Sequence, residues 1–172
     1  MDPIISIMEP APLFSLPGFN SAVYRLEEQR GRIVILDFWS AECPWSERAD
    51  HQLLAFLSAW GEAVSLWPIA SNANEPTDLL KGVSRLHGLP DVLRDEGQHV
   101  ANLYGAQTTP HLFVVDAQGL LRYQGALDDV TFRQRTPTRH YLRDAVEALL
   151  SGNQPEPDFT QPYGCAITRY NP

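Results

Sequence analysis

Cys43 is the residue of this sequence whose position most directly suggests chemistry. It follows an apolar stretch, residues 33–39, which is typical of a buried strand. It precedes Pro44, a residue type favoured in the first turn of a helix, and leucines recur at helical spacing from residue 47 onward. Free backbone N–H groups and the helix dipole at such a junction favour a thiolate. A thiolate is the nucleophile of thiol–disulfide exchange and of peroxide reduction.

Cys165 is the only other cysteine of the 172 residues. It follows a segment with three prolines, residues 153–162, that is typical of a linker. Loop-closure cost rises slowly with length, so the separation from Cys43 does not prevent pairing. A bond between the two cysteines would close a loop of about 120 residues, worth roughly 4–5 kcal/mol in the loop-entropy treatment. The alternative is that Cys165 is an idle or intermolecular thiol.

Three polar side chains lie close to Cys43 in the sequence. Asp37 belongs to the apolar stretch, so we expect partial burial and a raised pKa if the carboxyl is unpaired. Its alternative is a structural carboxylate hydrogen-bonded near a sheet edge. Ser40 and Ser46 can donate hydrogen bonds to the sulfur. Ser46 can equally be a plain first-turn residue, or stand in place of a cysteine.

The elements that must position these residues alternate along the chain. Strands are predicted at residues 22–26, 33–39, 64–70, 111–116 and 120–123, and helices at 44–60, 76–86, 98–104 and 141–150. This order predicts an α/β three-layer sandwich, in which a central mixed sheet is flanked by helices. We expect one domain over residues 1–152 and a proline-rich C-terminal tail over residues 153–172.

Residues 37–46 resemble the active-site segment of the thioredoxin superfamily, in which an aromatic strand end precedes Cys-x-x-Cys at a helix start. Residues 105–116 look like the family's segment with a cis-proline before a strand, and residues 119–125 like the following hairpin strand. The resemblance covers roughly residues 10–152. It implies a thioredoxin-like fold, and the long stretch between Cys43 and that proline implies a redoxin-type insert.

A closer match is the redoxin-domain, peroxiredoxin-like branch, of the alkyl hydroperoxide reductase and thiol-specific antioxidant type. The Leu-Asp-Asp sequence of residues 127–129 and the Gly-Cys-x-Ile sequence of residues 164–167 resemble that branch. The resemblance implies a cis-Pro110 beside the sulfur, with Thr109 offering its backbone to an extended substrate strand. An ordinary trans turn is the alternative. The resemblance also implies a proton-transfer role for Asp37. Trp39 and Trp45 flank the site and are expected to form an apolar rim; the alternative, a place in the core, applies above all to Trp39. Pro44 and Trp45 are among the expected substrate-binding residues.

Two departures from the family patterns bear on activity. Ser46 replaces the second cysteine of Cys-x-x-Cys, and a hydroxyl cannot resolve a mixed disulfide. Ser40 matches the peroxiredoxin Thr or Ser three residues before the cysteine, but Leu36 stands where that pattern has proline. Pro110 or its neighbours stand where it has arginine. These departures rank peroxidase activity below disulfide exchange.

The composition of the chain limits the classes of partner that it is expected to bind. The net charge of −8 disfavours nucleic acid and anionic membranes. There is no run of 18 apolar residues, and residues 1–17 lack the pattern of a signal peptide, so a cytoplasmic location is expected. The histidines have no metal-ligand spacing around either cysteine. We therefore expect no metal and no bound cofactor.

The first hypothesis is a thiol–disulfide oxidoreductase in which Cys43 attacks and Cys165, or an external thiol, resolves the intermediate. The second is a peroxiredoxin-like hydroperoxide reductase with an antioxidant role, in which Cys43 becomes a sulfenic acid. The third is a non-enzymatic redox-sensing or partner-binding module. The expected partners are protein or small-molecule disulfides and thiols, or a hydroperoxide. The sequence indicates no oligomeric state.

Overall fold

The computed structural model describes residues 4–171 and is built on one mixed sheet of five strands in the order β5-β4-β3-β7-β8. The strands are β3 (Ile33–Trp39), β4 (Val64–Ala70), β5 (Leu93–Arg94), β7 (His111–Val115) and β8 (Leu121–Gly125). The central strand β3 is buried throughout and pairs parallel with β4 and antiparallel with β7. Burial on both faces explains its nearly continuous apolar sequence.

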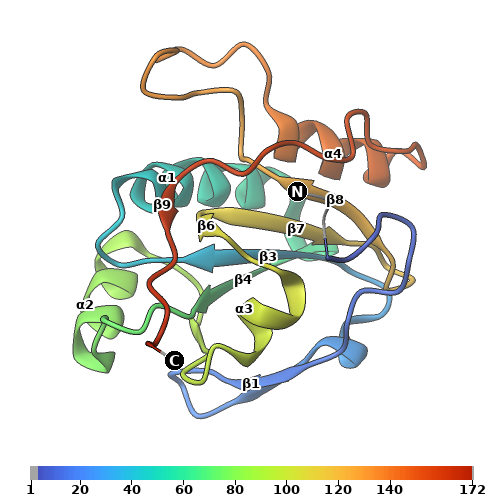
Figure 1. Ribbon diagram of the computed structural model, residues 1–172. Helices are drawn as coiled ribbons and strands as arrows, with labels where there is room; N and C mark the ends of the chain where they lie inside the picture. Colours follow the sequence, from blue (N-terminus) through green and yellow to red (C-terminus); the bar gives the residue numbers. More distant parts are fainter. Residues whose placement is uncertain (1–3, 172) are drawn as a thin grey trace.

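Two apolar clusters separate the layers, and successive residues of β3 alternate between them. Ile35 packs on the face covered by α1 (Pro44–Trp60) and α4 (Tyr141–Leu150). Leu36 and Phe38 pack on the other face, against α3 (His99–Tyr104) and the N-terminal segment. Figure 1 shows α1 and α4 on one side of the sheet and α3 on the other. The α/β three-layer prediction is confirmed.

The remaining elements are short. The strands β1 (Ser15–Pro17) and β2 (Val23–Arg25) form a separate antiparallel pair, and two 3-10 turns are η1 (Leu26–Gln29) and η2 (Gly61–Ala63). The insert between β4 and the cis-proline segment contains α2 (Thr77–His87), β5 and α3. Within the described residues, no helix is long and apolar enough to cross a membrane.

Pro68 argues against a regular strand at residues 64–70, yet β4 pairs with β3 without interruption over that whole range. The reason lies on the other edge of β4. There β5 pairs only with Ile69 and Ala70, within residues 4–171. At Pro68 this edge of β4 has no strand partner within the described residues, and an unpaired edge is where a sheet tolerates proline.

The C-terminal tail runs back across the domain and forms a two-stranded pair there (Figure 1). Its strand β9 (Cys165–Ala166) pairs antiparallel with β6 (Thr108–Thr109). The end of the segment expected to be a linker is also bonded to the sheet. The Gln124 N–H donates to the Asp158 carbonyl (3.1 Å), and the Thr160 N–H donates to the Gln124 carbonyl (3.0 Å). The tail thus pairs with the outer edge of β8 at Gln124, and covering an edge is one way in which sheets avoid unwanted pairing.

Candidate active site

Cys43 and Cys165 form a disulfide at the N-terminus of α1. Cys43 is the N-cap residue, only 3% exposed, and its carbonyl accepts the N–H of Glu47 (3.0 Å). The two Cα atoms are 6.2 Å apart, within the range of protein disulfides, although 122 residues separate them in sequence. Pro44 is exposed at the first helical position, and Ser46 is buried in the first turn.

Cys165 reaches this position because β9 lies against the segment before the cis-proline. Cys165 is paired with Thr109, and Ala166 with Thr108. Gly164 makes the approach possible, since a Cβ atom there would collide with the carbonyl oxygen of Thr109. The backbone pairing continues with Ile167, whose N–H donates to the Gln107 carbonyl (3.1 Å).

Further hydrogen bonds hold the tail beyond the disulfide. The Thr168 N–H donates to Asn72 Oδ1 (2.7 Å), and the Thr168 carbonyl accepts from the Ala73 N–H (3.0 Å) and from Gln98 Nε2 (2.7 Å). The Tyr170 N–H donates to Gln98 Oε1 (3.2 Å). These bonds do not involve sulfur. We therefore expect Cys165 to stay close to Cys43 when both are thiols, at a high effective concentration.

The Thr109–Pro110 peptide bond is cis, as expected. The carbonyl oxygen of Thr109 lies 3.0 Å from the Cys43 sulfur. The cis-proline segment and the helix N-terminus thus meet at the sulfur atom, although 66 residues separate Cys43 from Thr109.

Asp37 is completely buried in β3, on the face that also carries Ile35. Neither carboxyl oxygen has a hydrogen-bond partner among residues 4–171. Burial, and secondarily the charge of Asp50, raises the pKa of this carboxyl well above its ordinary value. Asp37 is paired on both sides, with Pro68 of β4 and Leu112 of β7, so the expectation of burial is met and the sheet-edge alternative is not.

The Asp37→Asn substitution should stabilise the protein at neutral pH by about 1–3 kcal/mol, because the wild-type carboxyl must either take up a proton on folding or remain as an unpaired buried charge. The pKa of Asp37 is higher in the folded than in the unfolded protein. The wild-type carboxyl therefore favours folding at low pH, and this contribution is lost as the pH rises through the folded pKa. Urea unfolding of the oxidised proteins at several pH values measures the free energy of unfolding. The difference in this free energy between the variant and the wild type should grow as the pH rises above the ordinary pKa range of a carboxyl group.

A matched control is Asp158→Asn, which changes an exposed aspartate of the tail. Its stability should track that of the wild type at every pH. If the difference in free energy of unfolding between Asp37→Asn and the wild type does not change with pH, this result would contradict the buried, unpaired state of Asp37.

Asp50, on α1, is a buried carboxylate that the sequence did not reveal. It accepts hydrogen bonds from Trp39 Nε1 (2.9 Å) and from His87 Nδ1 (2.7 Å), which ties β3, α1 and α2 together. Burial raises the pKa of Asp50, and the His87 and Trp39 bonds partly oppose that rise. Trp39 is therefore a core residue, and Asp50 is the charge that acts on Asp37.

Glu75 is a second buried carboxylate, 2% exposed, that reasoning from sequence missed. Its Oε1 accepts from the Ser40 hydroxyl (2.9 Å) and from the Glu42 N–H (3.0 Å), and its Oε2 accepts from Asn72 (2.9 Å). The Ser46 hydroxyl accepts the Ser40 N–H (3.3 Å). In this disulfide-bonded state both serines thus fix the turn before Cys43, and neither donates to the sulfur within residues 4–171.

Trp45 forms a rim at the site, and the tail covers it. Its ring packs edge-on against Tyr163, with centroids 4.8 Å apart. The Tyr163 hydroxyl accepts the Phe132 N–H (3.0 Å). The segment after β8 is also tied to α1, because Asp128 of the Leu-Asp-Asp sequence pairs with both terminal nitrogens of Arg48 (3.1 and 2.5 Å).

A cysteine at a helix N-terminus, facing a cis-proline on a mixed five-stranded sheet, defines a thioredoxin-fold protein with a redox-active cysteine pair. Residues 7–124 match the model of the AhpC/TSA family. The chain belongs to this family.

Relatives with assigned activities are thiol–disulfide oxidoreductases. The chain is 31% identical over 141 residues to the thiol:disulfide interchange protein DsbE of Yersinia pestis, covering 74% of this chain and 69% of that protein. It is 26% identical over 122 residues to the thiol-disulfide oxidoreductase ResA of Geobacillus thermodenitrificans, covering 69% of this chain and 68% of that protein. Fold, family and relatives together place this chain among the thioredoxin-fold oxidoreductases.

Two solved structures match nearly the whole chain, tail included. A hypothetical protein from Sinorhizobium meliloti gives a TM-score of 0.88 at 26% identity, covering 98% of this chain and 97% of that one. An uncharacterized conserved protein from Geobacillus kaustophilus gives a TM-score of 0.87 at 28% identity, covering 100% of this chain and 97% of that one. In the Geobacillus structure the aligned part thus includes the whole tail, residues 153–172.

Proposed function

We propose that Cys43 and Cys165 form an internal redox pair that reduces disulfide substrates. The Cys43 thiolate attacks one substrate sulfur, and the other leaves as a thiolate that takes up a proton. Cys165 loses its proton and attacks Cys43, which releases the second substrate thiol. The products are two substrate thiols and the Cys43–Cys165 disulfide. An external thiol restores the pair.

The observation that carries this proposal is the pairing of β9 with β6, which brings Cys165 to Cys43. Cys165 thereby provides a resolving thiol, which Ser46 cannot provide because it carries a hydroxyl group. The N-terminus of a helix favours the thiolate form of a cysteine placed there. Asp37, neutral when its pKa is raised, is a proton store beneath the same helix and the candidate for proton transfer.

The tail also bears on the class of partner. By family resemblance, the backbone of Thr109 is where an extended substrate strand would pair, and here β9 occupies that edge. A protein substrate that pairs at this edge must displace the tail, whereas a small-molecule disulfide needs no such pairing. Both classes remain in the proposal, and the assay below compares them.

The second candidate is a hydroperoxide reductase, favoured by membership of the AhpC/TSA family. The Cys43 thiolate would attack the peroxide oxygen, releasing an alcohol and leaving a sulfenic acid, and Cys165 would then form the disulfide and release water. Against it, the Ser40 hydroxyl is engaged by Glu75. A binding module without turnover is the third candidate. The cytoplasmic location is a further prediction, which cell fractionation tests.

Two turnover assays on the wild-type protein decide among these candidates. Reduction of insulin and of oxidised glutathione is measured with dithiothreitol as reductant, beside consumption of cumene hydroperoxide. We expect disulfide reduction to be the faster reaction. Mass spectrometry of the non-reduced product should show a Cys43–Cys165 disulfide, lighter than the dithiol by two hydrogens. Faster peroxide consumption would favour the peroxidase, and a stable adduct without turnover would favour the binding module.

A further inference from the structure

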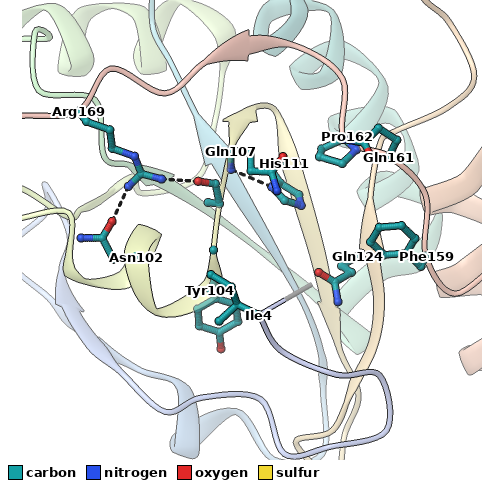
Figure 2. Close-up of a pocket in the computed structure, with 12 residues that line it drawn as sticks. Ile4, Asn102, Tyr104, Gln107, His111, Gln124, Phe159, Gln161, Pro162 and Arg169 are labelled. Carbon is teal, nitrogen blue, oxygen red and sulfur yellow. Dashed lines mark hydrogen bonds between the residues drawn. The ribbon is translucent and has the colours of Figure 1, made fainter. Parts of the chain in front are cut away.

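A pocket of about 470 Å³ lies beside the cis-proline segment, away from the two sulfurs. Figure 2 shows its walls, which come from α3, β7, β8 and the tail. The volume is in the usual range of small-molecule sites, which are largely apolar with a few placed polar groups. Tyr104, Phe159 and Pro162 supply apolar surface here.

His111 contributes an unpartnered polar atom to this pocket. The residue is 3% exposed, and its Nδ1 accepts the N–H of Gln107 (3.1 Å). Burial lowers the pKa of His111 to about 3, so the ring is neutral and its proton sits on Nε2. Nε2 has no partner within residues 4–171. In Figure 2 this nitrogen points away from Gln107, toward the side lined by Gln124 and Phe159.

A buried donor without a hydrogen-bond partner destabilises the folded protein. A ligand oxygen that accepts the Nε2 proton would remove this destabilisation. The pocket therefore favours a molecule that carries a hydrogen-bond acceptor on an apolar body.

Among the lining residues that the structure describes (within 4–171), Arg169 alone has a charged side chain. Its guanidinium donates to Asn102 Oδ1 (2.7 Å) and to the Ala106 carbonyl, and Figure 2 shows it at one end of the pocket. A guanidinium has five N–H donors, so others remain for a ligand. Its planar fork suits a carboxylate. On a chain of net charge −8, this fixed positive group selects anions.

We propose that this pocket binds a small carboxylate with an apolar, aromatic-sized body, and that binding stabilises the docked tail. Phe159 and Pro162 precede Cys165, and Arg169 follows it, so the pocket is complete only when the tail lies on the domain. A ligand that binds only this state favours it by mass action. The site is separate from the sulfur chemistry and does not depend on the proposed reaction.

The first test is calorimetric titration of the wild-type protein with 3-phenylpropionate and with its neutral amide, 3-phenylpropanamide. We expect the carboxylate to bind with a sub-millimolar Kd and more tightly than the amide. Arg169→Gln should weaken the carboxylate at least about tenfold and remove its advantage over the amide. Arg133→Gln, a matched change at an exposed arginine outside the pocket, should leave both affinities unchanged.

Arg169 also holds the tail, so a second variant blocks the pocket without touching those bonds. Gln161 lines the pocket and is exposed, and Gln161→Trp should abolish binding of both probes. Absence of binding to the wild type up to 10 millimolar probe (about the weakest binding that a specific site of this size should show) would mean that the pocket holds only water. That result, or equal affinity in Arg169→Gln and the wild type, would overturn the proposal.

The effect on the tail is measured in Cys165→Ser, which cannot form the disulfide. There 3-phenylpropionate should slow hydrogen exchange at the Ile167 N–H, which donates to Gln107. The Gln161→Trp change, added to this variant, should remove the slowing. Binding without slower exchange in the tail would overturn the coupling between pocket and tail.

Discussion

The Cys43→Ser variant should lose disulfide-reducing activity by about 10³-fold or more, because a serine hydroxyl at neutral pH is a far weaker nucleophile than a thiolate. The loss should appear in kcat/KM for insulin and for oxidised glutathione alike, since the first bond in both reactions forms at the Cys43 sulfur. Cys43→Ala should be equally inactive, which separates the role of the sulfur from any effect of the new hydroxyl.

The substitution should leave the fold intact, because Cys43 contributes no hydrogen-bonding side chain to the cap of α1. Circular dichroism of the reduced proteins provides this check. Ser58→Ala, at an exposed position of the same helix, should retain full activity. Substantial turnover by a folded Cys43→Ser protein would remove Cys43 from the mechanism and direct attention to Cys165.

The Cys165→Ser variant should be less stable than the oxidised wild type by about 4–5 kcal/mol, since the disulfide closes a loop of 122 residues in the unfolded chain. For a domain of this size that corresponds to a fall in Tm of about 10 °C or more. Thermal unfolding with and without a reductant measures it. The difference should nearly vanish when both proteins are reduced, because the tail keeps the hydrogen bonds of Thr168 and Tyr170 in both.

Cys165→Ser should also change the chemistry. With the resolving thiol gone, a mixed disulfide between Cys43 and glutathione should accumulate and be visible by non-reducing mass spectrometry. The wild type should pass through this species without accumulating it. If the adduct fails to accumulate while turnover continues at the wild-type rate, an external thiol resolves the intermediate and Cys165 has a structural role.

The hydrogen bonds of the tail explain how one cysteine can replace the local dithiol of the usual motif. A free tail of proline-rich sequence would bring Cys165 near Cys43 only part of the time. Here Asn72, Gln98 and the backbone of β6 fix its path. In the proposed reaction, resolution by Cys165 would thus be an intramolecular step at a prearranged position.

The sequence alone determined the parts that depend on local pattern. The buried strand before Cys43 follows from its apolar run, and the helix after it from Pro44 and the spacing of the leucines. The cis-Pro110 segment was predicted from its resemblance to a known motif. Burial of Asp37 followed from its place within that strand, because the face of the sheet on which it lies is covered by helices.

Tertiary structure decided the contacts between distant segments. Glu75 reaches the turn before Cys43 from 35 residues away along the chain, and His87 reaches Asp50 from 37 residues away. No local periodicity marks either carboxylate. Their partners depend on how α2 packs beside α1, which is a property of the assembled layers.

The C-terminal tail shows most clearly the difference between what local sequence predicts and what tertiary contacts decide. Its prolines indicate an extended chain, which is correct, but extension by itself does not say whether the chain is free or docked. Docking depends on the open edge of β6, on the space left by Gly164 and on acceptors such as Asn72, all of which exist only after the domain has folded. The sequence could therefore supply both cysteines, and only the folded chain could join them.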